Sequence, residues 1–210
     1  MPAQKGRVPS IYQLKITLKH TEPPVWRRIQ VPGNLDLIDL HDITQVFMGW
    51  DNDHLFEFVI GDVRYQDEHE DDNRGIKNAY NTRISSVFVR KGSKGAYIYD
   101  FGDYWEHEVL VEAISDPEPG VKYPLCVDGE RACPPEDCGG VGGYYRLLEI
   151  LKDPNHEEHD DMLEWVGHNI DPSKFDCEEA NKRLPHRKVL VRADGKQREH
   201  ENPSRNRQDG

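Results

Sequence analysis

The sequence predicts an α+β fold, a single domain in which a mainly antiparallel sheet of hairpins is flanked by helices and the C-terminal part is helical. Residues 12–18 alternate strictly between apolar and polar side chains, which is typical of a strand with one buried face. Apolar residues between 37 and 47 recur instead at helical spacing. A Gly-Asp turn signal at 102–103 separates two apolar runs, as in a β-hairpin.

The length and composition favour one folded domain with polar ends. The chain has 210 residues, near the usual size of one domain, and that length can bury a sufficient core. All four tryptophans lie between positions 26 and 165, so the polar excess belongs mainly to loops and ends. We expect a domain over residues 10–185, a disordered N-terminus at 1–9 and a disordered charged tail at 186–210.

The domain begins with a predicted hairpin and a helix. Two prolines at 23–24 break the first strand, and alternating apolar residues indicate a second strand over 25–31 that pairs with the first. Asp36 or Asp39 can cap the helix that follows, and Gly49 is placed to end it.

The middle of the chain predicts further strands and two loops. Strands are expected over 54–60, around 97–101 and over 104–114. The acidic segment 66–75 lacks the ordered acid spacing of a calcium-binding loop, which favours a solvated loop. Residues 117–143 are rich in Pro, Gly and Cys and show almost no periodicity. They predict a long ordered loop of the kind that often carries a functional site.

Three helices are predicted after that loop. Apolar residues share one helical face over 144–151. Asn155 and Glu158 form a capping-box pattern at the start of a second helix that ends at Val166. A similar pattern at Asp176 starts the third.

Charge and hydropathy exclude some partners. The formal net charge is −12, and the tail is locally basic, so the rest of the chain is more acidic still. Such a body repels a phosphate backbone, which disfavours general nucleic-acid binding. No window approaches the roughly 20 apolar residues of a membrane span. We expect a soluble cytoplasmic protein with no membrane partner, in which four cysteines are too few for a disulfide scaffold.

The stretch YDFGDYWEH at 99–107 gathers four aromatic residues, three acids and a histidine. Strand period places Trp105 and His107 on the apolar face. There His107 is either a core histidine, hydrogen-bonded to the backbone or an aspartate, or part of a site with Asp100 and Asp103.

Two other histidines could approach this hairpin. His41 lies in the first helix, and His54 begins the strand after GWDND. If they converge with the hairpin aspartates, a mixed histidine and carboxylate site suits zinc, manganese or iron. A histidine taken alone is more often structural.

Three cysteines form a second candidate constellation. Cys126, Cys133 and Cys138 are spaced Cys-x6-Cys-x4-Cys, which matches the paired knuckles of structural zinc only loosely. A zinc site completed by His107, Cys177 or another ligand, a disulfide between Cys133 and Cys138, and small buried thiols all stay open. Cys138 is also a candidate nucleophile, because it precedes two glycines near a helix start, where a thiol pKa is lowered.

Several segments, in order, resemble the plasmid pRiA4b ORF-3-like family: IYQLKITLKHTEPPVWRRIQVP, LHDITQVFMGWDNDHLFEF, YDFGDYWEH, and GERACPPEDCGGVGGYYRLLEIL followed by DPSKFD. The resemblance covers about residues 10–180. It implies an α+β domain with antiparallel strands in a largely uncharacterised, plasmid- or mobile-element-associated family. The family's motif positions here are Trp26, Arg27, Arg28, His41, Trp50, His54, Asp100, Gly102, Asp103, Trp105, His107, Cys133, Pro134, Pro135, Glu136, Asp137, Cys138, Gly139, Gly140 and Tyr144.

Our first functional hypothesis is a non-catalytic binding module. It would recognise a protein or a small ligand through the hairpin and the Pro/Cys/Gly loop, since shaped loops with aromatic anchors suit recognition. The expected binding residues are Trp26, Arg28, Trp50, Trp105, Asp137 and Tyr144.

Two alternatives are kept. The first is a metal-assisted hydrolase or nuclease with zinc as the cofactor considered. Its candidate catalytic residues are His107, Asp103, Asp100 and Glu136, with Asp137 as the alternative to Glu136 for the carboxylate, and its candidate metal ligands are His54, His107, Cys126, Cys133 and Cys138. This hypothesis predicts that the side chains cluster in one concave pocket. The second is transposon-linked DNA binding through a basic face that contains Arg27, Arg28 and the tail.

Overall fold

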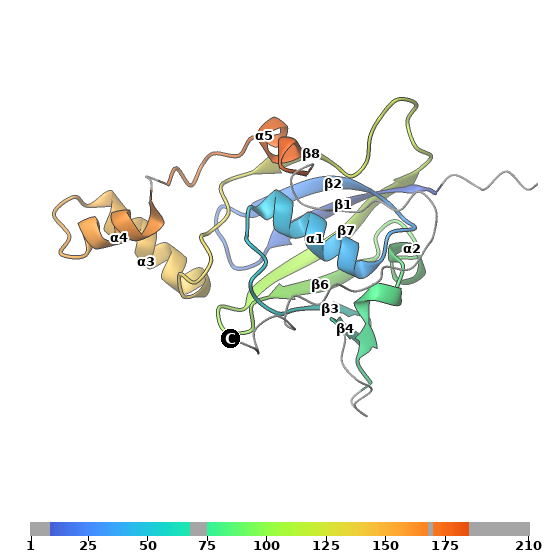
Figure 1. Cartoon of the computed structure of the whole chain (residues 1–210), viewed down its shortest axis with the longest axis horizontal. Coiled ribbons are helices and arrows are strands. Elements are labelled where there is room, and N and C mark those ends of the chain that lie inside the picture. Colours follow the sequence, from blue (N-terminus) through green and yellow to red (C-terminus); the bar gives the residue numbers. More distant parts are fainter. Residues whose placement is uncertain (1–8, 68–74, 168–169, 185–210) are drawn as a thin grey trace, which may run out of the picture.

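The computed structural model describes residues 9–67, 75–167 and 170–184. Its strands are β1 (Ile11–Leu18), β2 (Val25–Pro32), β3 (Phe56–Ile60), β4 (Val63–Gln66), β5 (Lys77–Asn78), β6 (Lys94–Tyr99), β7 (Trp105–Ser115) and β8 (Leu125–Glu130). Within the described residues they form one sheet in the order β5-β4-β3-β6-β7-β1-β2-β8, with antiparallel pairing except between β4 and β5 (Figure 1). The predicted α+β class is confirmed.

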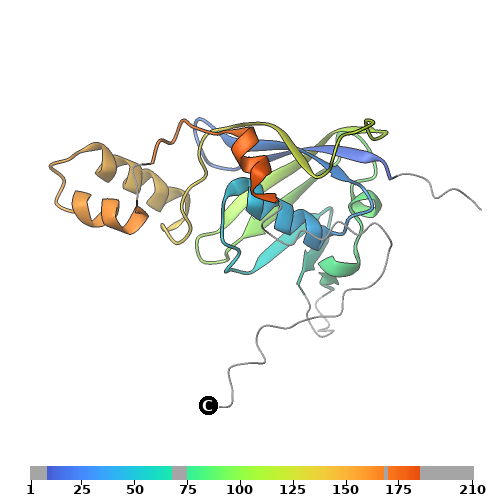
Figure 2. The same cartoon turned by 45° about the horizontal axis from the view of Figure 1, so that its top comes forward.

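The helices are α1 (Leu37–Met48), α2 (Ile84–Val87), α3 (Gly140–Lys152), α4 (His159–Val166) and α5 (Cys177–Lys182), with a 3-10 turn at Ala79–Asn81. Helix α1 lies across one face of the sheet, and its buried residues join those of β1, β2, β3, β6 and β7 in one core (Figure 1). Helix α5 packs beside β8, whereas α3 and α4 form a pair that projects from one end of the body (Figures 1 and 2).

The first hairpin forms as predicted because its alternation matches the pleat of a sheet. Leu14, Ile16 and Leu18 are fully buried, and the polar residues between them are half-buried. Strand β2 pairs antiparallel with β1, placing Leu14 opposite Ile29. One face of the sheet therefore closes on α1 while the other stays accessible to polar side chains.

The predicted ends of α1 are also confirmed. The Asp36 N–H donates to an Asp39 carboxylate oxygen at 3.0 Å, which satisfies a main-chain donor at the helix start. Gly49 ends the helix in the left-handed region (φ 93°), and its N–H donates to Gln45 O at 2.8 Å. This sharp stop turns the chain towards the segment that carries the candidate site.

Several element boundaries were wrong; for example, α3 begins at Gly140, inside the predicted loop, and β6 ends at Tyr99 rather than near 101. The long loop predicted over 117–143 contains β8, an edge strand hidden from a periodicity search because Cys126 is its one fully buried residue. Helix α4 begins at His159 rather than near Asn155, because residues before it form a turn in which Asn155 N–H donates to the Asp153 side chain. Residues 1–8, most of the acidic loop and residues 185–210 lie outside the described residues.

Strand β7 lies near the middle of the sheet, between β6 and β1. Trp105, His107, Val109 and Val111 are all buried on the α1 face, whereas Tyr104, just before the strand, is exposed. The predicted face of the YDFGDYWEH segment is thus confirmed. No helix in the described part of the chain is long and apolar enough to cross a membrane.

Candidate functional site

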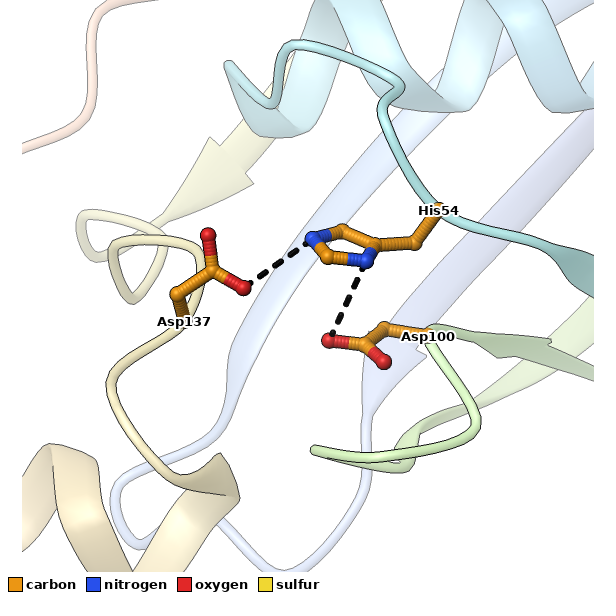
Figure 3. A group of neighbouring side chains, drawn as sticks. All are labelled: His54, Asp100 and Asp137. Atoms are coloured by element: carbon orange, nitrogen blue, oxygen red, sulfur yellow. Dashed lines mark ion pairs between the residues drawn. The ribbon is translucent and has the colours of Figure 1, made fainter.

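Three connections of the fold meet at one point beside the sheet. His54 precedes β3, Asp100 follows β6, and Asp137 lies just before α3 (Figure 3). His54 Nε2 is 3.1 Å from Asp137 Oδ1, and His54 Nδ1 is 3.9 Å from Asp100 Oδ2. The imidazole therefore lies between two carboxylates that come from distant parts of the sequence.

The local backbone holds both carboxylates in place. Asp100 (φ 56°) and Asp137 (φ 58°) adopt the left-handed region, which Asp tolerates better than most residues with a side chain. Asp100 Oδ1 accepts the Gly102 N–H at 2.8 Å, and the Asp100 main-chain carbonyl accepts the Tyr104 N–H at 2.7 Å. This turn fixes the carboxyl group and leaves Oδ2 as the oxygen nearest His54.

The Tyr99 hydroxyl joins the His54 segment to the Asp137 segment. It donates a hydrogen bond to Glu136 and accepts the N–H groups of Asp53 and His54 at 3.1 and 3.3 Å. Burial raises the Tyr99 pKa well above its usual value, so the phenol stays protonated and keeps its donor. Tyr99 therefore positions two of the three groups in the cluster.

The geometry of the cluster fits a divalent metal ion. One nitrogen and two carboxylate oxygens lie within 4.8 Å of one another, the one such group found among residues 9–67, 75–167 and 170–184. The separations of 3.1 and 3.9 Å involve the two different nitrogens of the His54 ring, so a single ion would be held by one of these nitrogens and by one oxygen from each carboxylate. Nitrogen and oxygen donors suit zinc, manganese or iron.

The cluster is open on one side. The exposed fraction of the side chain rises from 11% at Asp100 through 29% at His54 to 68% at Asp137. Structural zinc sites are closed by four protein ligands, whereas catalytic sites have three and keep a position for water. The cluster therefore offers three candidate ligands and one side open to solvent.

A pocket of about 300 Å³ adjoins the cluster at His54. It is lined by Ile38, His41, Asp42, Asn52, His54, Leu55, Phe56, Asp67 and Tyr80. As far as the structure describes the chain, the lining includes polar and acidic side chains beside apolar ones and contains no Lys or Arg.

His107, a predicted ligand and catalytic residue, lies apart from the cluster. Its ring is fully buried, with Nδ1 3.2 Å from Tyr97 O and an edge-on contact with Trp50. Burial lowers its pKa to about 4, so the ring is neutral near pH 7. This geometry favours the core-histidine interpretation.

The other predicted catalytic candidates support the site from outside the ligand set. Asp103 accepts the Gly139 N–H at 3.1 Å and so ties the hairpin to the start of α3. The approach is close, because a Cβ on Gly140 would lie 2.5 Å from Asp103 O. Glu136 accepts the Tyr99 hydroxyl and the Asp51 N–H, so both its oxygens are engaged.

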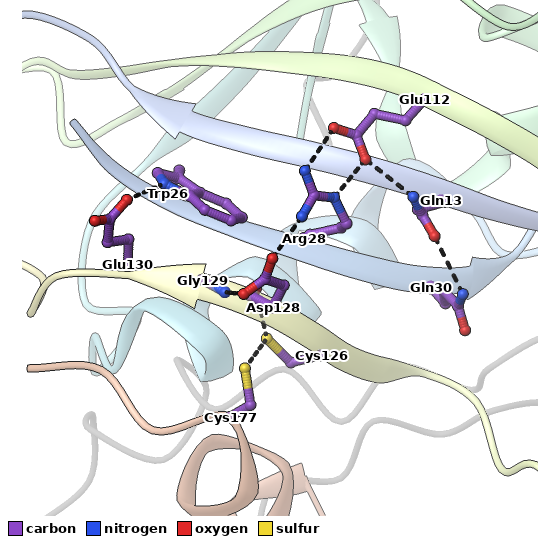
Figure 4. A network of polar contacts seen from close by, with 10 residues as sticks. All are labelled: Gln13, Trp26, Arg28, Gln30, Glu112, Cys126, Asp128, Gly129, Glu130 and Cys177. Atoms are coloured by element: carbon purple, nitrogen blue, oxygen red, sulfur yellow. Dashed lines mark hydrogen bonds and ion pairs between the residues drawn. The ribbon is translucent and has the colours of Figure 1, made fainter.

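The cysteines are free thiols and do not form a common ligand group. Cys126 Sγ lies 3.8 Å from Cys177 Sγ, between β8 and α5 (Figure 4). Cys133 and Cys138 lie in the loop before α3, where they are not disulfide-bonded. Burial raises the pKa of Cys126, Cys133 and Cys138 to about 12, the opposite of what a nucleophilic Cys138 requires.

Three of the predicted binding residues are core residues. Trp50, Trp105 and Tyr144 are each at most 2% exposed. Trp50 donates its indole N–H to Pro134 O at 2.9 Å and stacks on Tyr99 at 5.0 Å between ring centroids. These aromatic side chains belong to the core and offer little surface to a partner.

Trp26 and Arg28 lie instead on the accessible face of the sheet. The Arg28 guanidinium is 2.6 Å from Glu112 and 2.7 Å from Asp128, and it lies 4.9 Å from the Trp26 ring centroid (Figure 4). The neighbouring Arg27 is buried, donates to Phe47 O at 3.0 Å and stacks on Phe175. Neither arginine presents an unpaired charge to solvent.

The sequence interpretation missed Tyr99 and Asn52 as site residues. Tyr99 was counted only as one aromatic of a hairpin, and no spacing rule connects its hydroxyl to Glu136. Asn52 has φ 68°, and its place in GWDND was the one available signal, since Asn is enriched at left-handed positions.

Fold and site together define an α+β protein with an open histidine and carboxylate cluster beside a mainly antiparallel sheet. Residues 10–179 match the model of the family described as "Plasmid pRiA4b ORF-3-like protein", and the chain belongs to this family.

Two relatives extend the comparison. The uncharacterized protein y4hQ of Sinorhizobium fredii (strain NBRC 101917 / NGR234) is 41% identical over 175 residues, which are 83% of this chain and 88% of that protein. The crystal structure of the protein of unknown function MM3350 from Methanosarcina mazei Go1 is similar at a TM-score of 0.74 and 37% identity, over 81% of this chain and 97% of that chain. These relatives establish family and fold and leave the activity open.

Proposed function

We propose that this protein is a metal-dependent hydrolase whose ion is held by His54, Asp100 and Asp137. The observation that carries the proposal is the convergence of one imidazole and two carboxylates from three distant segments, all within 4.8 Å. The open side at Asp137 supports it, because a hydrolytic ion must keep a position for water.

The chemistry follows from the ligand set. A bound divalent ion would act as a Lewis acid and lower the pKa of water towards neutrality, so the residues themselves need not supply a strong base. Asp100 and His54, the less exposed residues, would hold the ion on its buried side, and the exposed Asp137 would be the third ligand, from the loop before α3 (Figure 3). Tyr99 would act as a positioning residue through Glu136 and the His54 N–H.

Metal analysis tests the proposal. Protein stripped with a chelator is incubated with Zn²⁺ or Mn²⁺, desalted and measured by elemental analysis, beside His54→Ala and Asp137→Asn. We expect about one equivalent of metal in the parent and a loss of at least tenfold in affinity in both variants. A matched control is His20→Ala, since His20 is exposed and distant in sequence from the cluster. Equal metal content in parent and His54→Ala would reject the site.

A non-catalytic binding module is the second candidate, and a specific observation favours it. A cavity of about 1220 Å³ is lined in part by residues 132–136, with Trp50, Phe175 and Trp165 also among its lining residues. A volume this large can hold a small ligand. Binding of small fragments that shifts the Trp165 indole NMR signal in metal-free protein would support this candidate, and unshifted signals across a fragment set would count against it.

A further inference from the structure

A line of hydrogen bonds runs from the core to the pocket beside His54. Gln45 Nε2 donates to the Tyr97 hydroxyl at 2.8 Å, and that hydroxyl lies 2.8 Å from His41 Nδ1. His41 Nε2 lies 2.6 Å from Asn52 Oδ1. Gln45, Tyr97 and His41 are each at most 2% exposed, whereas Asn52 is exposed.

The order of donors along this line fixes the orientation of Asn52. Because the Tyr97 hydroxyl accepts from Gln45, its own proton is available to His41 Nδ1. The proton of the neutral His41 ring is then on Nε2, and it is donated to Asn52 Oδ1. His41 is itself held by stacking on Phe56 at 3.8 Å between ring centroids.

The Oδ1 atom of Asn52 is therefore occupied by its hydrogen bond with the buried His41. The Nδ2 group of Asn52 has no hydrogen-bond partner in the described part of the chain, and Asn52 lines the pocket together with His54. The left-handed backbone at Asn52 (φ 68°) sets the direction from which its side chain leaves the chain. The result is a fixed pair of N–H donors two residues from a proposed metal ligand.

The lining of the pocket selects the chemistry that can enter. Among the described residues, this lining includes the acidic Asp42 and Asp67, which oppose a phosphate group, and no Lys or Arg that would bind one. Ile38, Leu55 and Phe56 supply apolar surface. A volume of about 300 Å³ suits a small neutral compound.

We propose that this pocket binds a small neutral amide or ester beside the metal, and that Asn52 donates a hydrogen bond to its carbonyl oxygen. This inference rests on the proposed function. In the reaction, the water oxygen bonds to the carbonyl carbon, the C–N or C–O bond breaks, and the protons of the water pass to the acid and the leaving amine or alcohol. Negative charge grows on the carbonyl oxygen, where a fixed donor stabilises it.

The test uses the full chain loaded with Co²⁺, whose visible absorption reports both metal binding and ligand binding. The probes are acetohydroxamic acid, a small carbonyl compound that is neutral in solution and chelates a metal as its hydroxamate anion, and inorganic phosphate. The variants are Asn52→Gly, which suits the positive φ and removes the amide, and Asn52→Asp, which keeps the acceptor for His41 and removes the donors.

We expect hydroxamate to bind the parent and to weaken about tenfold in both variants, the value of roughly one lost hydrogen bond. Co²⁺ affinity should stay unchanged in Asn52→Gly, although the unfolding midpoint should fall because the buried His41 loses its acceptor. In Asn52→Asp, which keeps that acceptor, both should stay unchanged, so weaker hydroxamate binding there excludes a merely structural role. Equal hydroxamate affinity in parent and variants, or tighter binding of phosphate than of hydroxamate, would overturn the pocket assignment and leave the metal site standing. Failure of the parent to bind Co²⁺ would instead overturn the proposed function, and this inference with it.

Discussion

The Tyr99 hydroxyl connects the segments that carry two of the three ligands. It is bonded to Glu136 on one side and to the Asp53 and His54 N–H groups on the other. Since Asp137 follows Glu136 directly, the hydroxyl sets the separation of His54 from Asp137. Supporting groups of this kind commonly change metal affinity by 10- to 100-fold when removed.

Tyr99→Phe should therefore weaken metal binding while leaving the fold intact. The ring would keep its stacking on Trp50, and only the hydroxyl contacts would be lost. We expect the dissociation constant for Zn²⁺ to rise about 10-fold or more, measured by competition with a chromophoric chelator. Tyr104→Phe is the matched control, because Tyr104 belongs to the same hairpin and its side chain is exposed. An unchanged constant in Tyr99→Phe would contradict the positioning role.

The buried His107 should make stability depend on pH. Its pKa is lowered from 6.5 to about 4 by burial, so below pH 6.5 the unfolded chain binds a proton that the folded chain does not. The contribution of His107 to stability is thus present above pH 6.5 and declines as pH falls towards 4. Between pH 7 and about pH 4.5 the loss amounts to about 2 to 3 kcal/mol.

Urea unfolding at these two pH values checks the sign. The parent should lose more free energy of unfolding on acidification than His107→Gln, by about 2 kcal/mol, since glutamine does not titrate. Carboxylates and His41 contribute to both proteins equally and cancel in the difference. Equal losses in parent and variant would show that His107 is not buried as described.

At the scale of elements, Asn181 of α5 completes the edge of the sheet. Its Oδ1 accepts the Cys126 N–H at 2.8 Å, and its Nδ2 donates to Cys126 O at 2.8 Å. The side-chain amide thus replaces the neighbouring strand that β8 lacks. An edge strand covered in this way is protected from pairing with another chain.

Asn181→Ala should loosen α5 from β8. Two main-chain groups of Cys126 would lose their partners, at a cost of about 1 to 3 kcal/mol in the free energy of unfolding. Amide hydrogen exchange at Cys126 should become faster, and thermal unfolding should begin earlier. Lys182→Ala on the same helix removes only an exposed ion pair with Glu179 and should change stability by less than about 0.5 kcal/mol. Similar effects of the two substitutions would refute the edge-closing role.

The elements that alternation specifies were predictable, and those that depend on a distant partner were not. The hairpin at 12–31 and helix α1 follow from the spacing of apolar residues and from Asp36 and Gly49. Strand β8 was not predicted because it has no apolar pattern of its own and is held in place by β2 and Asn181. His54, Asp100 and Asp137 were all among the candidates of the hydrolase hypothesis, but which of its candidates converge depends on contacts between distant segments that no local rule can register.

At the scale of the whole molecule, charge decides which partners are suitable. The chain carries a net charge of −12, Arg27 is buried, and Arg28 lies between two carboxylates. These two arginines therefore do not contribute to the basic face that DNA binding requires. A polyanion would meet repulsion over most of the surface.

We accordingly expect no DNA binding at physiological salt. Fluorescence anisotropy of a labelled duplex should stay constant up to about 100 µM protein, the weak end of ordinary non-specific affinities. The same titration with a chain ended after residue 184 separates any contribution of the basic tail. Binding by the full chain that survives this truncation would show a basic face in the body and revive the DNA-binding hypothesis.

The stacking of Trp50 on Tyr99 provides the protein with a built-in optical reporter. Trp50 and Trp105 are both buried, but of the four indoles only Trp50 stacks on Tyr99, whose hydroxyl anchors the cluster. Trp165, in contrast, is 48% exposed and lies on the projecting helix pair. A paramagnetic ion at His54 would quench the Trp50 emission at short range, and iodide in solution would quench Trp165 first. Occupancy of the site can therefore be followed in the unlabelled protein by the colour and lifetime of its own fluorescence.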